Sequence, residues 1–131
     1  MQDHDESILD AHALSEAGRS LATTTRRIED PAAAYAVLGY TSSALASLTQ
    51  TLHQLGAFHD RLATINPGPG HDSRAVRVAA HTISWELHRA AEVIRQVACG
   101  IDRAHEIEAT IDTPYRRSTA APVAPIPGLP R

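Results

Sequence analysis

Histidine and carboxylate side chains are the residues of this sequence that could carry chemistry. The chain has eight histidines, and several flank a proline- and glycine-rich segment at residues 66–70. If the chain folds back at that segment, Leu62 lies opposite Val76 and Leu55 opposite Ile83. Imidazoles and carboxylates of both arms then gather near one end of the fold, as in metal sites built inside helical bundles. The candidate metal ligands are His53, His59, His81 and His88, with Asp60 beside them.

This way of folding back also predicts particular neighbours for two of the histidines. It places His59 near His81, and His53 near Trp85 and Glu86. Only His59 falls on the apolar side of its helix, so the others are expected at a groove edge or in solvent. A transition-metal-binding bundle is therefore the alternative function that the sequence supports.

Two short motifs have the spacing of a known metal-binding element. His12-x-x-x-Glu16 and His88-x-x-x-Glu92 resemble the His-x-x-x-Glu piece of hemerythrin-like di-iron bundles, and that resemblance implies a helical metal protein. The repeated pairs and the further histidines of the hemerythrin pattern are absent. Ion pairs on one helix face explain the same spacing.

Enzyme signatures are few. Arg74-x6-His81 is similar to the Arg/His pair of HEPN-type ribonucleases, but Ala75 stands where a polar residue usually follows the arginine. The Gly68-Pro69-Gly70 segment has prolines where a phosphate-binding loop needs N–H donors, and no nucleophile elbow is present. We expect a protein without catalytic residues and without a cofactor.

The composition excludes several classes of protein. A net charge of −3 argues against a dedicated nucleic-acid-binding protein, and one cysteine, Cys99, allows no internal disulfide. Residues 31–48 are only moderately apolar, so we expect no membrane span. The acidic first residues lack the pattern of a secretory signal, which favours a cytoplasmic location. All twelve basic residues are arginine, which is typical of a GC-rich bacterial genome.

The hydrophobic periodicity predicts an all-α fold, an antiparallel three-helix bundle. A shorter helix is expected over residues 6–29, and two long helices over residues 31–65 and 73–111. At 1.5 Å per residue, each long helix would extend roughly 50–60 Å.

Local signals set the boundaries of these helices. Asp30-Pro31 ends the first helix and caps the second, because proline suits the first helical position and disfavours helix before it. The run of prolines and glycines at 66–70 ends the second helix, and Asp72 or Ser73 caps the third. The domain is expected over residues 1–113, followed by a disordered, proline-rich tail over residues 114–131.

The second helix has two apolar lines at heptad spacing and the third has one apolar seam, which is typical of coiled-coil packing. Small, uncharged residues on every side of the second helix indicate a helix enclosed by others, with close backbone approach. The lines of the second helix are Leu38, Leu45, Leu52 and His59, and Thr41, Leu48, Leu55 and Leu62. The third helix has Val76, Ala80, Ile83, Leu87, Ala90, Ile94, Val97, Ile101, Ala104 and Ile111.

These lengths predict self-association. A short first helix cannot cover the whole groove of a long hairpin, and each apolar side chain left in water forgoes about 1.5–3 kcal/mol. We expect a homodimer that acts as an interaction or scaffold module, with a further protein partner possible and no nucleic acid or membrane. The candidate interface residues are Leu38, Leu45, Leu48, Leu52, Leu55, Trp85, Ile94 and Ile101.

Overall fold

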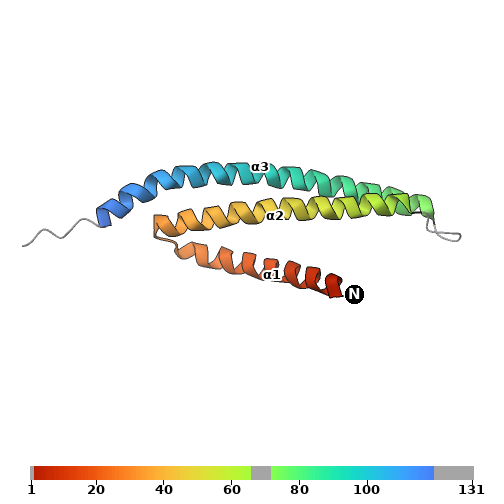
Figure 1. Cartoon of the computed structure of the whole chain (residues 1–131), viewed down its shortest axis with the longest axis horizontal. Coiled ribbons are helices and arrows are strands. Elements are labelled where there is room, and N and C mark those ends of the chain that lie inside the picture. The colour runs from red at the N-terminus through yellow and green to blue at the C-terminus, as the bar shows by residue number, and fades with distance from the viewer. Residues whose placement is uncertain (1, 66–71, 120–131) are drawn as a thin grey trace, which may run out of the picture.

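The computed structural model describes residues 2–65 and 72–119, and these residues form helices without any strand (Figure 1). Helix α1 spans Gln2–Thr24 and continues as a short 3-10 turn, η1, over Thr25–Arg27. Helix α2 spans Pro31–Thr64, and helix α3 spans Ser73–Thr119. The all-α prediction with three helices is confirmed. No helix within the described ranges has a stretch apolar and long enough to cross a membrane.

The predicted capping residues begin the two long helices. The Asp30 carboxylate accepts a hydrogen bond from the Ala32 amide at 3.0 Å, and Pro31 occupies the first turn. Asp72 accepts from the Ala75 amide at 3.1 Å, so Asp72 rather than Ser73 caps α3. These contacts satisfy N–H groups that have no partner inside the helix.

Three predicted boundaries are wrong. Helix α1 begins at Gln2 instead of residue 6. The regular part of α1 ends at Thr24 instead of residue 29. At this end the hydroxyls of Thr24 and Thr25 donate to carbonyl oxygens of the preceding turn, which favours a tighter winding. Helix α3 continues past the predicted end at residue 111 and through Pro114 to Thr119. Proline removes one backbone hydrogen bond but keeps a helical φ, so helix can persist on both sides of it. Of the predicted tail, residues 120–131 lie outside the described part of the chain.

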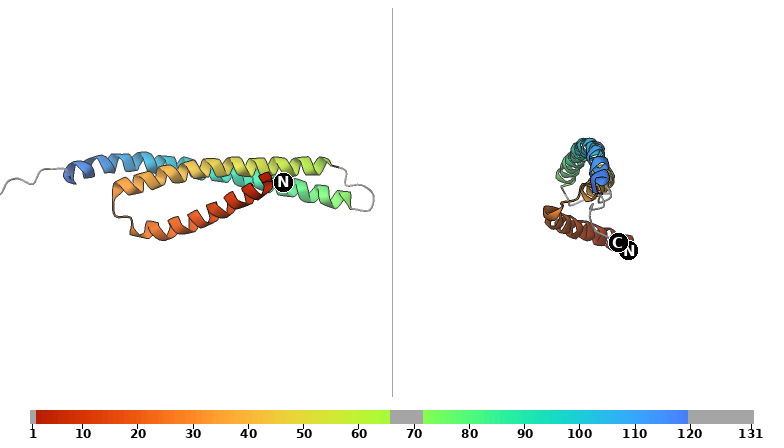
Figure 2. Two further views of the ribbon diagram at one scale, coloured as in Figure 1. Left: turned by 60° about the horizontal axis from the view of Figure 1, so that its bottom comes forward. Right: turned by 90° about the vertical axis from the view of Figure 1, so that its left-hand side faces the viewer.

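Helices α2 and α3 form a long antiparallel hairpin, and α1 lies apart from it. Their 34 and 47 residues correspond to about 51 and 70 Å. In the described part of the chain, close approaches between α-helices join only α2 to α3. Figures 1 and 2 show α1 turning back beside α2 and lying to one side of the hairpin, with a gap between the ribbons.

Small residues make the contact between α2 and α3. The buried residues of the described ranges are Gly56, Ala63, Ala80, Ser84 and Ala91, and no large side chain among them is fully buried. The expected enclosure of the second helix is wrong within the described residues, since α2 closely approaches no α-helix but α3. A close approach to the α2 backbone is seen at Gly56, where a Cβ would stand 2.8 Å from the His88 ring. The large apolar side chains therefore flank this contact instead of filling it.

The register of the hairpin differs from the predicted one. Ser84 meets Asp60, and the rings of His88 and His105 lie over Gly56 and Gly39. This pairing is shifted by several residues from the predicted register, which set Leu55 opposite Ile83. The shift arises because more residues separate the two helices than a tight turn needs.

Only part of the predicted apolar seam of α3 faces α2. The half-buried line of α3 toward α2 includes Leu87, Ile94 and Ile101, and it alternates with the small residues Ser84 and Ala91. The rest of the predicted seam turns aside and stays exposed, at Val76, Ile83, Val97 and Ile111. On α2 the contrast is smaller: Leu38, Leu45 and Leu52 are half-buried, and of the other line Leu48 and Leu62 are half-buried as well, while Leu55 is exposed.

Candidate functional site

The apolar lines that turn aside lie on the same side of the hairpin. A groove of about 350 Å³ joins them near the end of α2, where Leu62 and Ile65 face Val76 and Ile83. We call this side the open face. Its large side chains each expose between 43 and 63% of their surface: Leu55, Phe58, Ile65, Val76, Ile83, Val93, Val97, Ile107 and Ile111.

On α3 the open face has the spacing of a coiled-coil seam. Apolar or small residues recur every three or four positions along the helix, with one charged break at Glu86. A seam of this kind packs against a neighbouring helix. The series is Val76, Ala79, Ile83, Ala90, Val93, Val97, Gly100, Ala104, Ile107 and Ile111.

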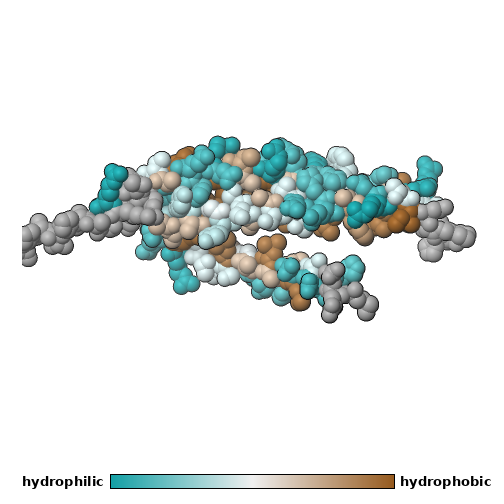
Figure 3. All heavy atoms as spheres, viewed as in Figure 1, coloured by the Kyte–Doolittle hydropathy of each residue, from teal (hydrophilic) through white to brown (hydrophobic). Residues whose placement is uncertain are grey.

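A second apolar hollow lies between α1 and α2. It has a volume of about 650 Å³ and is lined on one side by Asp10, Ala11 and Leu14 and on the other by Leu48 and Leu55, among others. Figure 3 shows apolar surface on the sides of α1 and α2 that face each other, and at the end of the hairpin nearest residue 65. Helix α1 therefore leaves α2 partly uncovered.

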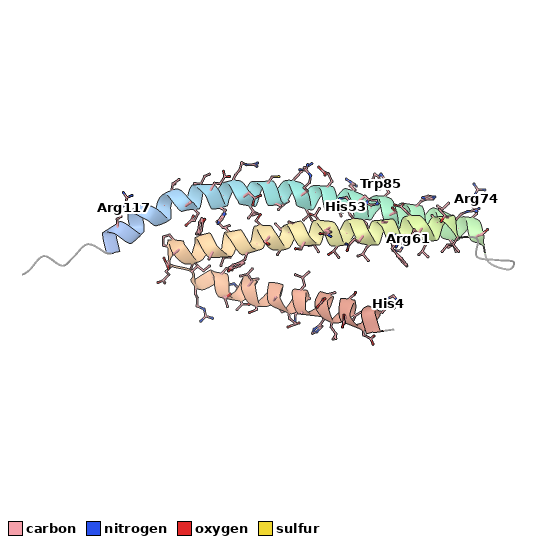
Figure 4. The ribbon with its side chains drawn as sticks, in the orientation of Figure 1. His4, His53, Arg61, Arg74, Trp85 and Arg117 are labelled. Carbon is pink, nitrogen blue, oxygen red and sulfur yellow. The ribbon has the colours of Figure 1, made fainter. Side chains whose placement is uncertain are left out.

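The predicted interface residues fall into three groups. Leu48, Leu52 and Leu55 line the hollow toward α1, so Leu55 stands where this hollow borders the open face. Trp85 is 60% exposed and points away from α2, with the Arg89 guanidinium 5.4 Å from its ring centre (Figure 4). The others are half-buried between α2 and α3: Leu38, Leu45, Ile94 and Ile101.

The opposite side of the hairpin, its back, carries a chain of hydrogen-bonded polar side chains. His53 Nδ1 lies 2.9 Å from His88 Nδ1, and His88 Nε2 lies 3.2 Å from an Asp60 carboxylate oxygen. The hydroxyl of Ser84, which is buried, donates to the other Asp60 oxygen at 2.5 Å. The hydrogen bond from Ser84, then the one from His88, lowers the pKa of Asp60, so this carboxylate stays ionised.

Of the four predicted ligands, the structure brings His53 and His88 into direct contact. His53 pairs with His88 instead of lying beside Trp85 and Glu86, because the hairpin register is shifted. His59 lines the groove of the open face, and His81 lies close enough to Asp60 to be the smallest of the influences that lower the pKa of Asp60. Among the residues that the structure describes, no three His, Cys, Asp or Glu side chains form a group that could hold a metal ion.

A second histidine contact was not predicted. The His105 ring stacks on Tyr35, with ring centres 4.0 Å apart, and lies over Gly39. The same distance along the chain separates Gly39 from Gly56 and His88 from His105, so an antiparallel hairpin makes both contacts together. Glycines within an otherwise regular helix were the available signal, since glycine permits close approach.

Charged pairs follow the histidine cluster along the back of α3. Arg95 binds both oxygens of Glu92, at 2.9 and 2.7 Å. These bonds, together with one from Gln96, lower the pKa of Glu92 to about 2. Farther along, Ser42 of α2 donates to Asp102 of α3. The back of the hairpin is therefore polar, in contrast to the open face.

Comparison with protein-family models, curated proteins and solved structures finds no match for this chain. Its function is therefore argued from its own surfaces and contacts.

Proposed function

We propose that this chain is a non-enzymatic helical interaction module that forms a homodimer through its open face. The observation that carries the proposal is the difference in size between the buried residues and the exposed apolar residues of the hairpin. The buried residues of the hairpin are all small, while nine large apolar side chains on one side of it stay about half exposed. Contiguous apolar surface of this extent marks an interaction site.

The magnitudes favour association. Complete burial of a large apolar side chain contributes about 1.5–3 kcal/mol, so a half-exposed one gains roughly 0.7–1.5 kcal/mol in an interface. Nine such side chains on each of two copies give about 13–27 kcal/mol, against an association cost of about 4–15 kcal/mol. The middle of the first range exceeds the middle of the second by roughly 10 kcal/mol, which favours a stable dimer.

A second copy is the occupant that this surface favours. The open face of α3 repeats at heptad spacing along the helix, and the same seam on another copy has matching length and spacing. A two-fold dimer buries the open face of both copies and leaves the polar backs in water. We also propose a cytoplasmic location, which the free thiol of Cys99 supports.

Sedimentation equilibrium of the purified chain tests this proposal. We expect twice the chain mass of 14.1 kDa. Ile83→Glu and Val97→Glu should each weaken the dimer at least about tenfold, because a charge replaces a buried apolar group. Val78→Glu is the matched control: Val78 is 58% exposed but lies about 140° around α3 from Ile83.

Two results would contradict the proposal. One is a wild-type chain that stays at the monomer mass at about 0.1 mM, where even a weak dimer forms. The other is an equal loss of dimer in the Val78→Glu control, since the contact would then not be on the open face. Circular dichroism of each variant separates a loss of association from a loss of helix.

A further inference from the structure

Helix α1 faces α2 across the hollow without packing on it. Within the described residues, no Cα atom of α1 lies within 8 Å of one of α2. The hollow of about 650 Å³ nonetheless takes one wall from each helix, and Figure 1 shows the gap between the two ribbons widening toward the start of α1. Because helices in direct contact have axes about 8–10 Å apart, α1 stands in an open position relative to α2.

The two walls of the hollow are mostly apolar. On α1, Leu14 and Leu21 are seven residues apart and therefore lie on the same side of the helix. They expose 51 and 39% of their surface. Three leucines of α2 form the opposite wall, Leu55 among them, and of the described lining residues Asp10 alone is charged. If the hollow closed, these apolar side chains would leave water, so burial favours a closed α1.

The connection between α1 and α2 allows such a movement. After η1 only residues 28–30 precede α2, and Ile28 and Asp30 have an extended backbone with ψ of 122°. A few residues at the end of a helix can absorb the changes of φ and ψ that swing the helix as a rigid body. Since the connection is short, α1 of the same chain stays close to this hollow at every protein concentration.

We propose that α1 is a lid that closes onto α2 and regulates the dimer by competing with the second copy. This inference rests on the proposed homodimer. Leu55 lines the hollow and also belongs to the open face, so α1 and a second copy cannot both cover it. Closing and association therefore oppose each other. The apparent affinity of the dimer falls in proportion to the fraction of chains with α1 open.

Variants of α1 in the full chain test the competition, with the dimer measured by sedimentation equilibrium. Leu14→Asp opposes closing, so it should tighten the dimer by roughly threefold to tenfold, the effect of burying one half-exposed leucine. Asp10→Leu removes the charge from the hollow and adds an apolar side chain, so it should weaken the dimer. Leu9→Asp is the matched control. Leu9 is 67% exposed and about 140° around α1 from Leu14, so this variant should leave the dimer unchanged.

A disulfide tests the closing directly and does not depend on the dimer. Ala11→Cys and Thr51→Cys, one on each wall of the hollow, are combined with Cys99→Ser. Two cysteines bridge only when their Cα atoms come within about 7 Å, which the open position of α1 does not allow. In a glutathione redox buffer we expect a disulfide within one chain, and a weaker dimer in the oxidised protein than in the reduced one. Leu9→Cys in place of Ala11→Cys should not bridge.

Three results would overturn the proposal. The first is a dimer that Leu14→Asp weakens or leaves unchanged, and weakening would make α1 part of the dimer contact. The second is a disulfide that joins two chains, which would place α1 on the second copy. The third is a Leu9→Cys control that bridges as readily as Ala11→Cys, or a pair that does not bridge at all. Circular dichroism of each variant separates these effects from a loss of helix.

The two proposals can fail separately. A wild-type chain that stays monomeric contradicts the homodimer and the competition, whereas the disulfide within one chain still reports the closing. A wild-type dimer without that disulfide contradicts the lid and leaves the open face as the dimer contact.

Discussion

Gly56 offers the sharpest test of how α2 and α3 pack. A Cβ at this position would lie 2.8 Å from both Cε1 and Nε2 of His88, closer than such atoms approach. The His88 ring would have to move, although it is held by His53 and Asp60. Gly56→Ala therefore breaks the contact at the centre of the hairpin unless the helices separate.

The expected size follows from two opposing effects. Alanine gains about 1 kcal/mol over glycine inside a helix. Loss of the two His88 hydrogen bonds costs about 2–3 kcal/mol, since one of them is to a charged group. Gly56→Ala should therefore lower the free energy of unfolding by about 1–2 kcal/mol.

Two other glycines calibrate this result. At Gly100, which belongs to the open face, a Cβ meets only Arg103 Nη2 of its own chain, at 3.8 Å. In the Ile83→Glu background, where the proposed dimer contact is removed, Gly100→Ala should therefore stabilise the protein by about 1 kcal/mol, and the other two glycine variants are compared in the same background. At Gly39 the nearest atom is His105 Nε2 at 3.1 Å, and Gly39→Ala should fall between the other two variants. Urea unfolding followed by circular dichroism at one protein concentration measures all three. If Gly56→Ala is as stabilising as Gly100→Ala, the His88 ring does not lie over Gly56 and the register described here is wrong.

Three further predictions concern the back and the ends of the hairpin. Arg95 lowers the pKa of Glu92 from 4.5 to about 2, so their pairing stabilises the fold above pH 4.5 and is lost as the pH falls toward 2. Arg95→Met removes this pairing, so the variant should lose less helicity than the wild type over that range in an acid titration followed by circular dichroism. Trp85 lies about 160° around α3 from Ile83, so its fluorescence should not shift when the dimer is diluted, and a blue shift in the dimer would place it in the interface. Asp30→Ala should cost about 0.5–2 kcal/mol in urea unfolding, because the Ala32 amide loses its cap; an unchanged stability would contradict the cap.

Much of the helical layout was predictable because its causes are local. Asp30 and Pro31 begin α2 through one carboxylate and one fixed φ, and Asp72 begins α3 through its carboxylate alone. These effects act within a turn of helix, so a short stretch of sequence contains them. The end of α3 was not predictable from Pro114, since proline disfavours helix interiors but keeps a helical φ, and the helix continues to Thr119.

The histidine cluster was predictable only in part. The sequence placed His53, His88 and Asp60 in one region, and the structure decided that the two histidines touch. A shift of a few residues between two helices changes every cross-helix neighbour while leaving each helix unaltered. No pattern within one helix determines that shift.

The amino-acid sequence alone determined which stretches are helical and which of their residues are apolar. It could not decide which apolar residues of each long helix meet the other helix, because all of them recur at the same heptad spacing. In the tertiary structure the helices meet at their smallest residues, Gly56, Ser84 and Ala91. With these residues in the contact, each helix is oriented about its axis so that Ile83 and Val97 of α3 face outward. The open face exists because close packing of small residues in the hairpin leaves its larger apolar side chains on the surface.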